Sequence, residues 1–123
     1  MSNLQRALLA VLFVCTAGAP ASGDVFSRIC VNNNAAFVLD FKIVDDKGVQ
    51  SIRSDPFPVA QQSCFHIAQI PNVESGAIVT VHINAHLGSS IACDRTVIYD
   101  PTSPFTASYA VSGTTLNIHC DSN

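Results

Sequence analysis

The chain has no tryptophan, one methionine and few charges, since aspartate, glutamate, lysine and arginine make up 12% of its 123 residues. Without tryptophan, it lacks the Cys–Trp–Cys core of antibody domains. Its six basic residues are scattered, so no basic stripe for nucleic acid is present, and we expect no nucleic-acid partner. No long apolar run follows the one near the N-terminus, so we expect no membrane span in the mature chain.

Sequence motifs for common catalytic mechanisms are also missing. The chain contains no Gly-x-Ser-x-Gly elbow, no His-Glu-x-x-His and no glycine-rich phosphate loop. We therefore expect no catalytic residues, no enzymatic activity and no cofactor. A pair of carboxylates for glycoside hydrolysis stays open, because a sequence does not show separations in space.

The first 23 residues have the order of a secretory signal peptide. Arg6 supplies a positive charge, residues 7–15 form an unbroken apolar run, and small residues follow as far as Gly23. The run is shorter than the roughly 20 residues that a bilayer span needs. We predict cleavage after Ala21 or Gly23, and a single secreted, extracellular domain over residues 24–123.

Four of the five cysteines (Cys30, Cys64, Cys93 and Cys120) remain after Cys15 leaves with the signal peptide. An even number of exported cysteines predicts two disulfides and no reactive thiol. If successive strands run antiparallel, Cys64 and Cys93 lie at one end of the domain, and Cys120 lies roughly 20 Å away at about 3.3 Å per residue. Because bridged Cα atoms lie within about 7 Å of each other, we predict the pairs Cys64–Cys93 and Cys30–Cys120.

Apolar residues alternate with polar ones after the signal, and no helical stripe is present. Residues 37–43 and 79–85 each place an apolar side chain at every second position, which is typical of half-buried strands. Turn residues separate about eight expected strands, at 28–33, 36–44, 49–53, 62–68, 77–86, 91–99, 105–111 and 114–120. Ser112 and Gly113 are a candidate two-residue hairpin turn. These features predict an all-β fold, a small antiparallel sandwich of immunoglobulin-like or Greek-key type.

One candidate binding site is the connection that holds Phe57 between two prolines. A rigid loop that presents an aromatic ring is a plausible anchor for a protein or a sugar. Asp55, on the same connection, and Arg53, at the end of the strand expected at 49–53, are further candidate contacts. In the alternative interpretation, Phe57 plugs one end of the core.

His82, Asn84 and His86 form a second candidate, because they share one face of the strand expected at 77–86. Zinc ligation by the two histidines is disfavoured. Residues four apart on a strand are about 13 Å apart, whereas both ligands of a zinc ion must come within about 2.1 Å of it. We interpret these residues as hydrogen-bonding or solvated groups on an outer sheet face.

A calcium site is the third candidate. Asp45, Asp46, Glu74 and Asp100 lie on loops that the antiparallel scheme gathers at one end of the domain. Calcium takes six to eight oxygen ligands, which carboxylates and backbone carbonyls can supply. The alternative is that aspartate occurs here simply as a good turn residue.

These features favour a small secreted binding module that recognises a carbohydrate or an extracellular protein through its loops. A secreted defence or virulence factor, such as an inhibitor or a toxin-like effector, is the first alternative. A small secreted hydrolase is the second. The sandwich architecture does not choose between them, because one fold hosts many functions.

Overall fold

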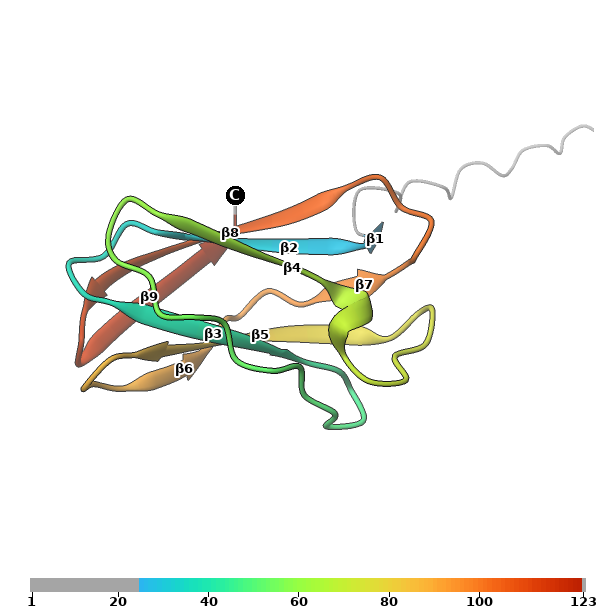
Figure 1. The fold of residues 1–123 in the computed structure, drawn as a ribbon, viewed down its shortest axis with the longest axis horizontal. Coiled ribbons are helices and arrows are strands. Elements are labelled where there is room, and N and C mark those ends of the chain that lie inside the picture. Colours follow the sequence, from blue (N-terminus) through green and yellow to red (C-terminus); the bar gives the residue numbers. More distant parts are fainter. Residues whose placement is uncertain (1–24, 123) are drawn as a thin grey trace, which may run out of the picture.

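A computed structural model describes residues 25–122, which form nine strands and one 3₁₀ turn in two stacked sheets (Figure 1). The predicted signal peptide and Cys15 lie outside the described residues. The elements are β1 (Val25–Phe26), β2 (Arg28–Asn33), β3 (Leu39–Val44), β4 (Gln62–His66), η3 (Ile67–Gln69), β5 (Ile78–Ala85), β6 (Ser90–Ala92), β7 (Val97–Tyr99), β8 (Thr106–Thr114) and β9 (Asn117–Ser122).

Both sheets are mixed. The first has the order β1-β7-β5-β3, with β6 paired to β5, and the second has the order β4-β2-β8-β9. The expected all-β sandwich is confirmed, but β1 pairs with β7, and β2 with β8, in parallel. Both parallel pairs join strands that are distant in the chain. The intervening chain crosses between the sheets, and such long crossovers permit parallel pairing.

The core lies between the two sheets and follows the predicted alternation. On β3, Leu39, Phe41 and Ile43 have no exposed surface, and the same holds for every second residue of β5 from Val79 to Ile83. The second sheet adds Tyr109, whose buried hydroxyl donates to the Arg95 carbonyl oxygen at 2.9 Å. That bond satisfies the polar end of an otherwise apolar side chain.

Three expected boundaries are wrong. Residues 49–53 lie along β3 but form no strand, with an isolated bridge between Gln50 and Val44, and residues 91–99 divide into the short strands β6 and β7. The hairpin turn lies at residues 115–116 rather than at Ser112 and Gly113. Gly113 instead lies within β8 at a φ of +99°, where a Cβ would collide with the Asn117 carbonyl oxygen. Glycine is required there by this close approach and by its positive φ.

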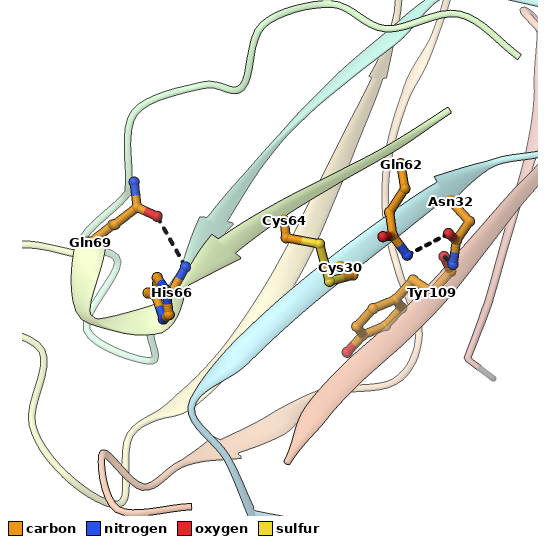
Figure 2. Close-up of a disulfide and its surroundings, with 7 residues drawn as sticks. All are labelled: Cys30, Asn32, Gln62, Cys64, His66, Gln69 and Tyr109. Carbon is orange, nitrogen blue, oxygen red and sulfur yellow. Dashed lines mark hydrogen bonds between the residues drawn. A yellow bond between two sulfur atoms is a disulfide. The ribbon is translucent and has the colours of Figure 1, made fainter. Parts of the chain in front are cut away.

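The two predicted disulfides are present, but the predicted pairing is wrong. Cys30 bonds to Cys64 directly across the β2–β4 pair, with Cα atoms 4.0 Å apart (Figure 2). Cys93 bonds to Cys120, with Cα atoms 5.3 Å apart, and so joins the chain after β6 to β9 in the other sheet. The prediction assumed cysteines at strand ends. The bonded cysteines of β2, β4 and β9 instead lie within their strands, and the chain leaves its sheet at Cys93.

Beside the first disulfide, polar side chains also tie neighbouring segments together. Gln62 Nε2 donates to Asn32 Oδ1 at 2.7 Å across the same strand pair (Figure 2). At the end of β4, the His66 backbone N–H donates to Gln69 Oε1 at 3.0 Å, which fixes the start of η3. A disulfide and a side-chain hydrogen bond therefore both join β2 to β4.

Asn33 is a polar residue inside the protein, with no exposed surface. Its Nδ2 donates to the carbonyl oxygens of Phe37 at 2.7 Å and Phe57 at 3.0 Å. Its Oδ1 accepts the Ala35 N–H at 2.9 Å. One amide therefore satisfies three backbone groups of two connections at the same end of the sandwich.

We predict that Asn33→Ala lowers the free energy of unfolding by about 2–3 kcal/mol, because it removes three hydrogen bonds to buried backbone groups. A urea titration of the oxidised protein measures this. Asn117→Ala is the control, since Asn117 is exposed on β9 and its loss is expected to change stability by less than about 0.5 kcal/mol. Equal urea midpoints for Asn33→Ala and the wild type would show that the Asn33 bonds do not stabilise the fold.

Peptide mapping under non-reducing conditions is expected to recover Cys30 linked to Cys64 and Cys93 linked to Cys120. Replacing Cys93 and Cys120 together with alanine removes a cross-link spanning 27 residues. In the chain-entropy model this costs about 3–4 kcal/mol of stability, measurable by calorimetry. A peptide that links Cys64 to Cys93 would contradict the strand arrangement described above.

Candidate functional site

Polar side chains form two rows across the outer face of the sheet that contains β3, β5 and β6. Because the alternate residues of these strands fill the core, their neighbours point away from it. The strand register places Asp40 opposite Asn84, and Asn84 opposite Ser90. In the next row, Lys42 lies opposite His82. We call the polar face the set formed by Asp40, Lys42, Arg53, His82, Asn84 and Ser90.

Asp40 is the centre of this face. Arg53 Nη1 donates to Asp40 Oδ1 at 2.9 Å, and Asn84 Nδ2 reaches Asp40 Oδ2 at 3.5 Å. Ser90 Oγ donates to Asn84 Oδ1 at 2.6 Å, which extends the chain of bonds to β6. The Asp40 side chain is only 11% exposed, whereas that of Arg53 is 49% exposed. The carboxylate is thus enclosed by its partners, while the guanidinium remains available to a ligand.

Arg53 reaches Asp40 because residues 50–57 run along the edge of β3. The Ser51 N–H donates to the Ile43 carbonyl oxygen and the Ser54 N–H to that of Phe41, at 2.9 and 2.8 Å. In return, the Ile43 N–H donates to Ser51 Oγ and the Phe41 N–H to Ser54 Oγ, both at 3.0 Å. Serine hydroxyls thus replace the carbonyls of a regular ladder. The segment covers the strand edge without forming a strand, and it fixes Arg53 between the two serines.

The second row combines a cation with an imidazole. Lys42 Nζ donates to Gln50 Oε1 at 2.8 Å. Partial burial, and then the nearby Lys42 ammonium, lower the pKa of His82 below its usual 6.5. At neutral pH, His82 is therefore uncharged and offers one donor and one acceptor.

The structure brings together three of the six predicted binding residues, namely Arg53, His82 and Asn84. Phe57 is only 5% exposed and its ring packs edge-on against that of Phe41, with centroids 6.3 Å apart, so its prediction as an exposed anchor is wrong. The alternative, in which Phe57 plugs the core, is confirmed. Asp55 is exposed on the segment that carries Arg53. His86 follows the end of β5, in the turn toward β6.

The predicted calcium ligands do not come together as one set. Asp45, Asp46 and Glu74 line a hollow of about 150 Å³, but Lys47 Nζ shares it and lies 3.2 Å from Glu74 Oε1. Asp45 Oδ1 accepts the N–H groups of Lys47 and Val49. Within residues 25–122, no group of three or more histidine, cysteine, aspartate or glutamate side chains is placed to hold a metal ion. The arrangement fits the alternative, in which aspartate serves the turn.

Asp100, the fourth predicted ligand, also stabilises its own loop. Its Oδ1 accepts the backbone N–H and the hydroxyl of Thr102, at 2.9 and 2.7 Å. These two bonds lower the pKa of the Asp100 carboxyl. The charged form is therefore stabilised by the turn itself.

Sequence reasoning missed Asp40, Lys42 and Ser90, which complete the polar face. The signal for Asp40 was present, since it is a carboxylate between two buried apolar residues of one strand. The pairing of Asp40 with Arg53 gave no such signal, because Arg53 lies in an irregular segment whose path depends on two serine hydroxyls. Ser90 lies one residue before the strand expected at 91–99, and the strand that contains it, β6, is only three residues long.

No protein-family model and no curated protein matches the sequence. Solved structures that resemble 79% of the chain include pneumolysin (10% identity, TM-score 0.45), a structure described as "Trapped Toxin" (14%, 0.43), and a disulfide-locked mutant of intermedilysin with human CD59 (14%, 0.38). The match spans only 23%, 22% and 24% of those chains, respectively. At such identities and TM-scores, the likeness supports no argument about function.

None of the helical structure in residues 25–122 has the length and apolarity needed to traverse a bilayer.

We predict that His82 makes the fold less stable as the pH falls. Because its pKa is lowered in the folded state, the unfolded chain binds the proton first once the pH drops through about 6.5. The free energy of unfolding therefore decreases below this pH, until the folded state also binds the proton. Calorimetry from neutral to mildly acidic pH should show a smaller fall in melting temperature for His82→Gln than for the wild type. Lys42→Met should reduce the fall in part, and parallel curves for all three proteins would contradict the assignment.

Proposed function

We propose that this chain is an extracellular, disulfide-stabilised binding module without enzymatic activity, and that its polar face binds a glycan. The bonded set of Arg53, Asp40 and Asn84 carries the proposal. Sugar hydroxyls both donate and accept hydrogen bonds, so they match a surface on which guanidinium, amide, imidazole and hydroxyl groups lie side by side. Because these groups are already held in place, binding would cost little additional side-chain ordering.

The bonding of Asp40 favours binding over catalysis. Each of its two oxygens already has a donor, from Arg53 or from Asn84. A general base must be within hydrogen-bond reach of the proton that it abstracts, and an enclosed carboxylate offers little such access. The groups around it fix a geometry for recognition, which is what a binding surface requires.

The two disulfides support the extracellular location. Both bonds are present in the described structure, and paired cysteines persist mainly in oxidising compartments. Export also agrees with the signal peptide predicted for residues 1–23. A secreted module of this kind meets cell-surface and matrix glycans.

A glycan array probed with the purified, oxidised chain tests the proposal. We expect Asn84→Ala to weaken binding to the glycans that the wild type retains by about tenfold, the effect of losing one or two well-placed hydrogen bonds. Asn117→Ala is the matched control, because it makes the same change on the exposed surface of β9 in the other sheet. Equal loss in both variants, or no retained glycan, would contradict a glycan site on the polar face.

The same protein distinguishes the alternatives. Association with a defined extracellular protein, weakened by Asn84→Ala, would indicate a protein partner, as expected of an inhibitor or effector. Turnover of ester, peptide or glycoside substrates would contradict the non-enzymatic proposal. A hydrolase of this kind would also lose turnover when its carboxylates are replaced by amides.

A further inference from the structure

Four connections meet at one end of the sandwich, on the left in Figure 1. They are residues 34–38, 58–61, 86–89 and 115–116, and none of them contains aspartate, glutamate, lysine or arginine. Backbone bonds join them to each other and to the strands. The His86 N–H donates to the Val38 carbonyl oxygen at 2.8 Å, and the Ala60 N–H to that of Asn33 at 2.7 Å. We call this surface the uncharged end.

The opposite end of the sandwich has a different composition. The connections there contain Asp45, Asp46, Lys47, Glu74 and Asp100. Of the turns at the two ends of the sandwich, those at this end carry ionised groups and those at the uncharged end carry no aspartate, glutamate, lysine or arginine. Such a separation distinguishes the uncharged end from an ordinary polar loop surface.

Several apolar side chains at the uncharged end are exposed to solvent and take no part in the core. Leu87 is 93% exposed, Leu116 is 81% exposed and Val59 is 53% exposed. The two leucines lie on neighbouring hairpin turns, which are joined by the Ser89 N–H donating to the Thr115 carbonyl oxygen at 2.8 Å. Gly88 packs so closely on Thr115 that a Cβ would not fit. The leucines are consequently presented together on a bonded pair of turns.

Leu87 also has a backbone conformation that is unfavourable for leucine. Its φ is +61°, in the left-handed region that asparagine and glycine adopt far more readily than leucine. A leucine at this position gains no burial in return, since nearly all of it is exposed. Folding alone therefore gives no reason for leucine here, and the side chain is available to a partner.

We propose that the uncharged end inserts its leucine turns into the interfacial region of a zwitterionic lipid bilayer. The leucines lie on exposed turns rather than in a groove, and a fluid acyl layer can surround such tips without a matching pocket. Insertion removes their apolar surface from water, and no charged group of these connections has to enter the interface. Uncharged polar groups beside the turn, such as Thr114 and Asn117, can bond to headgroups. This site uses no residue of the polar face.

Flotation with phosphatidylcholine vesicles tests the proposal. Leu87→Asn and Leu116→Ser are each expected to lower the partition coefficient about tenfold, as expected when one leucine is no longer buried. Ile52→Ser is the matched control, because Ile52 is 71% exposed but lies on the segment along β3. The proteins differ only at the substituted residue, so a difference in their partition coefficients is caused by that residue. Leu87→Asn should melt no lower than the wild type, because asparagine tolerates the left-handed backbone.

The absence of tryptophan from the chain allows an independent measurement. Leu116→Trp introduces a single tryptophan, whose emission should shift to shorter wavelength with vesicles, whereas that of Ile52→Trp should not. Adding phosphatidylserine should not strengthen binding, because the chain has a formal net charge of −3.

Four results would overturn the proposal. Three concern binding: no vesicle binding by the wild type, undiminished binding by the Leu87→Asn/Leu116→Ser double variant, and binding that appears only with phosphatidylserine. The fourth is an unshifted Leu116→Trp spectrum on bound protein. Loss of glycan binding in the array would leave these vesicle results unaffected, so the two proposals fail separately.

Discussion

The buried amide of Asn33 is the constraint on which the uncharged end depends. Its three side-chain bonds hold the connection after β2 and the carbonyl of Phe57 in one place. The main chain of Asn33 also bonds to Ala60 and Gln61, so the next connection is fixed as well. An apolar side chain could fill the same volume but could not satisfy these backbone groups, and burying them unpaired is costly. Specific polar bonding, rather than apolar packing alone, thus shapes this end of the sandwich.

Residues 50–57 cover the edge of β3 and satisfy its backbone groups. An open edge offers unpaired N–H and C=O groups to other chains. Here the serines supply hydroxyl acceptors where a neighbouring strand would supply carbonyls. The same arrangement carries Arg53 to Asp40, while Phe57 closes the core against Phe41. Edge protection, core closure and the polar face therefore come from one irregular segment.

The sandwich carries two surfaces of different chemistry, the polar face and the uncharged end. The polar face consists of fixed hydrogen-bonding groups on regular strands, whereas the uncharged end consists of apolar turns joined by backbone bonds. The first suits a ligand that is itself rich in hydroxyls, and the second suits an apolar phase. Since the two surfaces share no residue, one molecule could engage a glycan and a lipid surface together.

The sequence by itself determined the all-β class, the inward faces of the main strands and the number of disulfides. Alternation is a property of neighbouring residues, so Leu39, Phe41 and Ile43 could be assigned to the core without knowing what they pack against. It also placed His82 and Asn84 on the outer face. Only the tertiary structure decided which strands are adjacent, and with that the Cys30–Cys64 and Cys93–Cys120 pairs and the meeting of Arg53 with Asp40. These contacts join residues distant in the chain, and they depend on crossovers and on an irregular segment for which no local period exists.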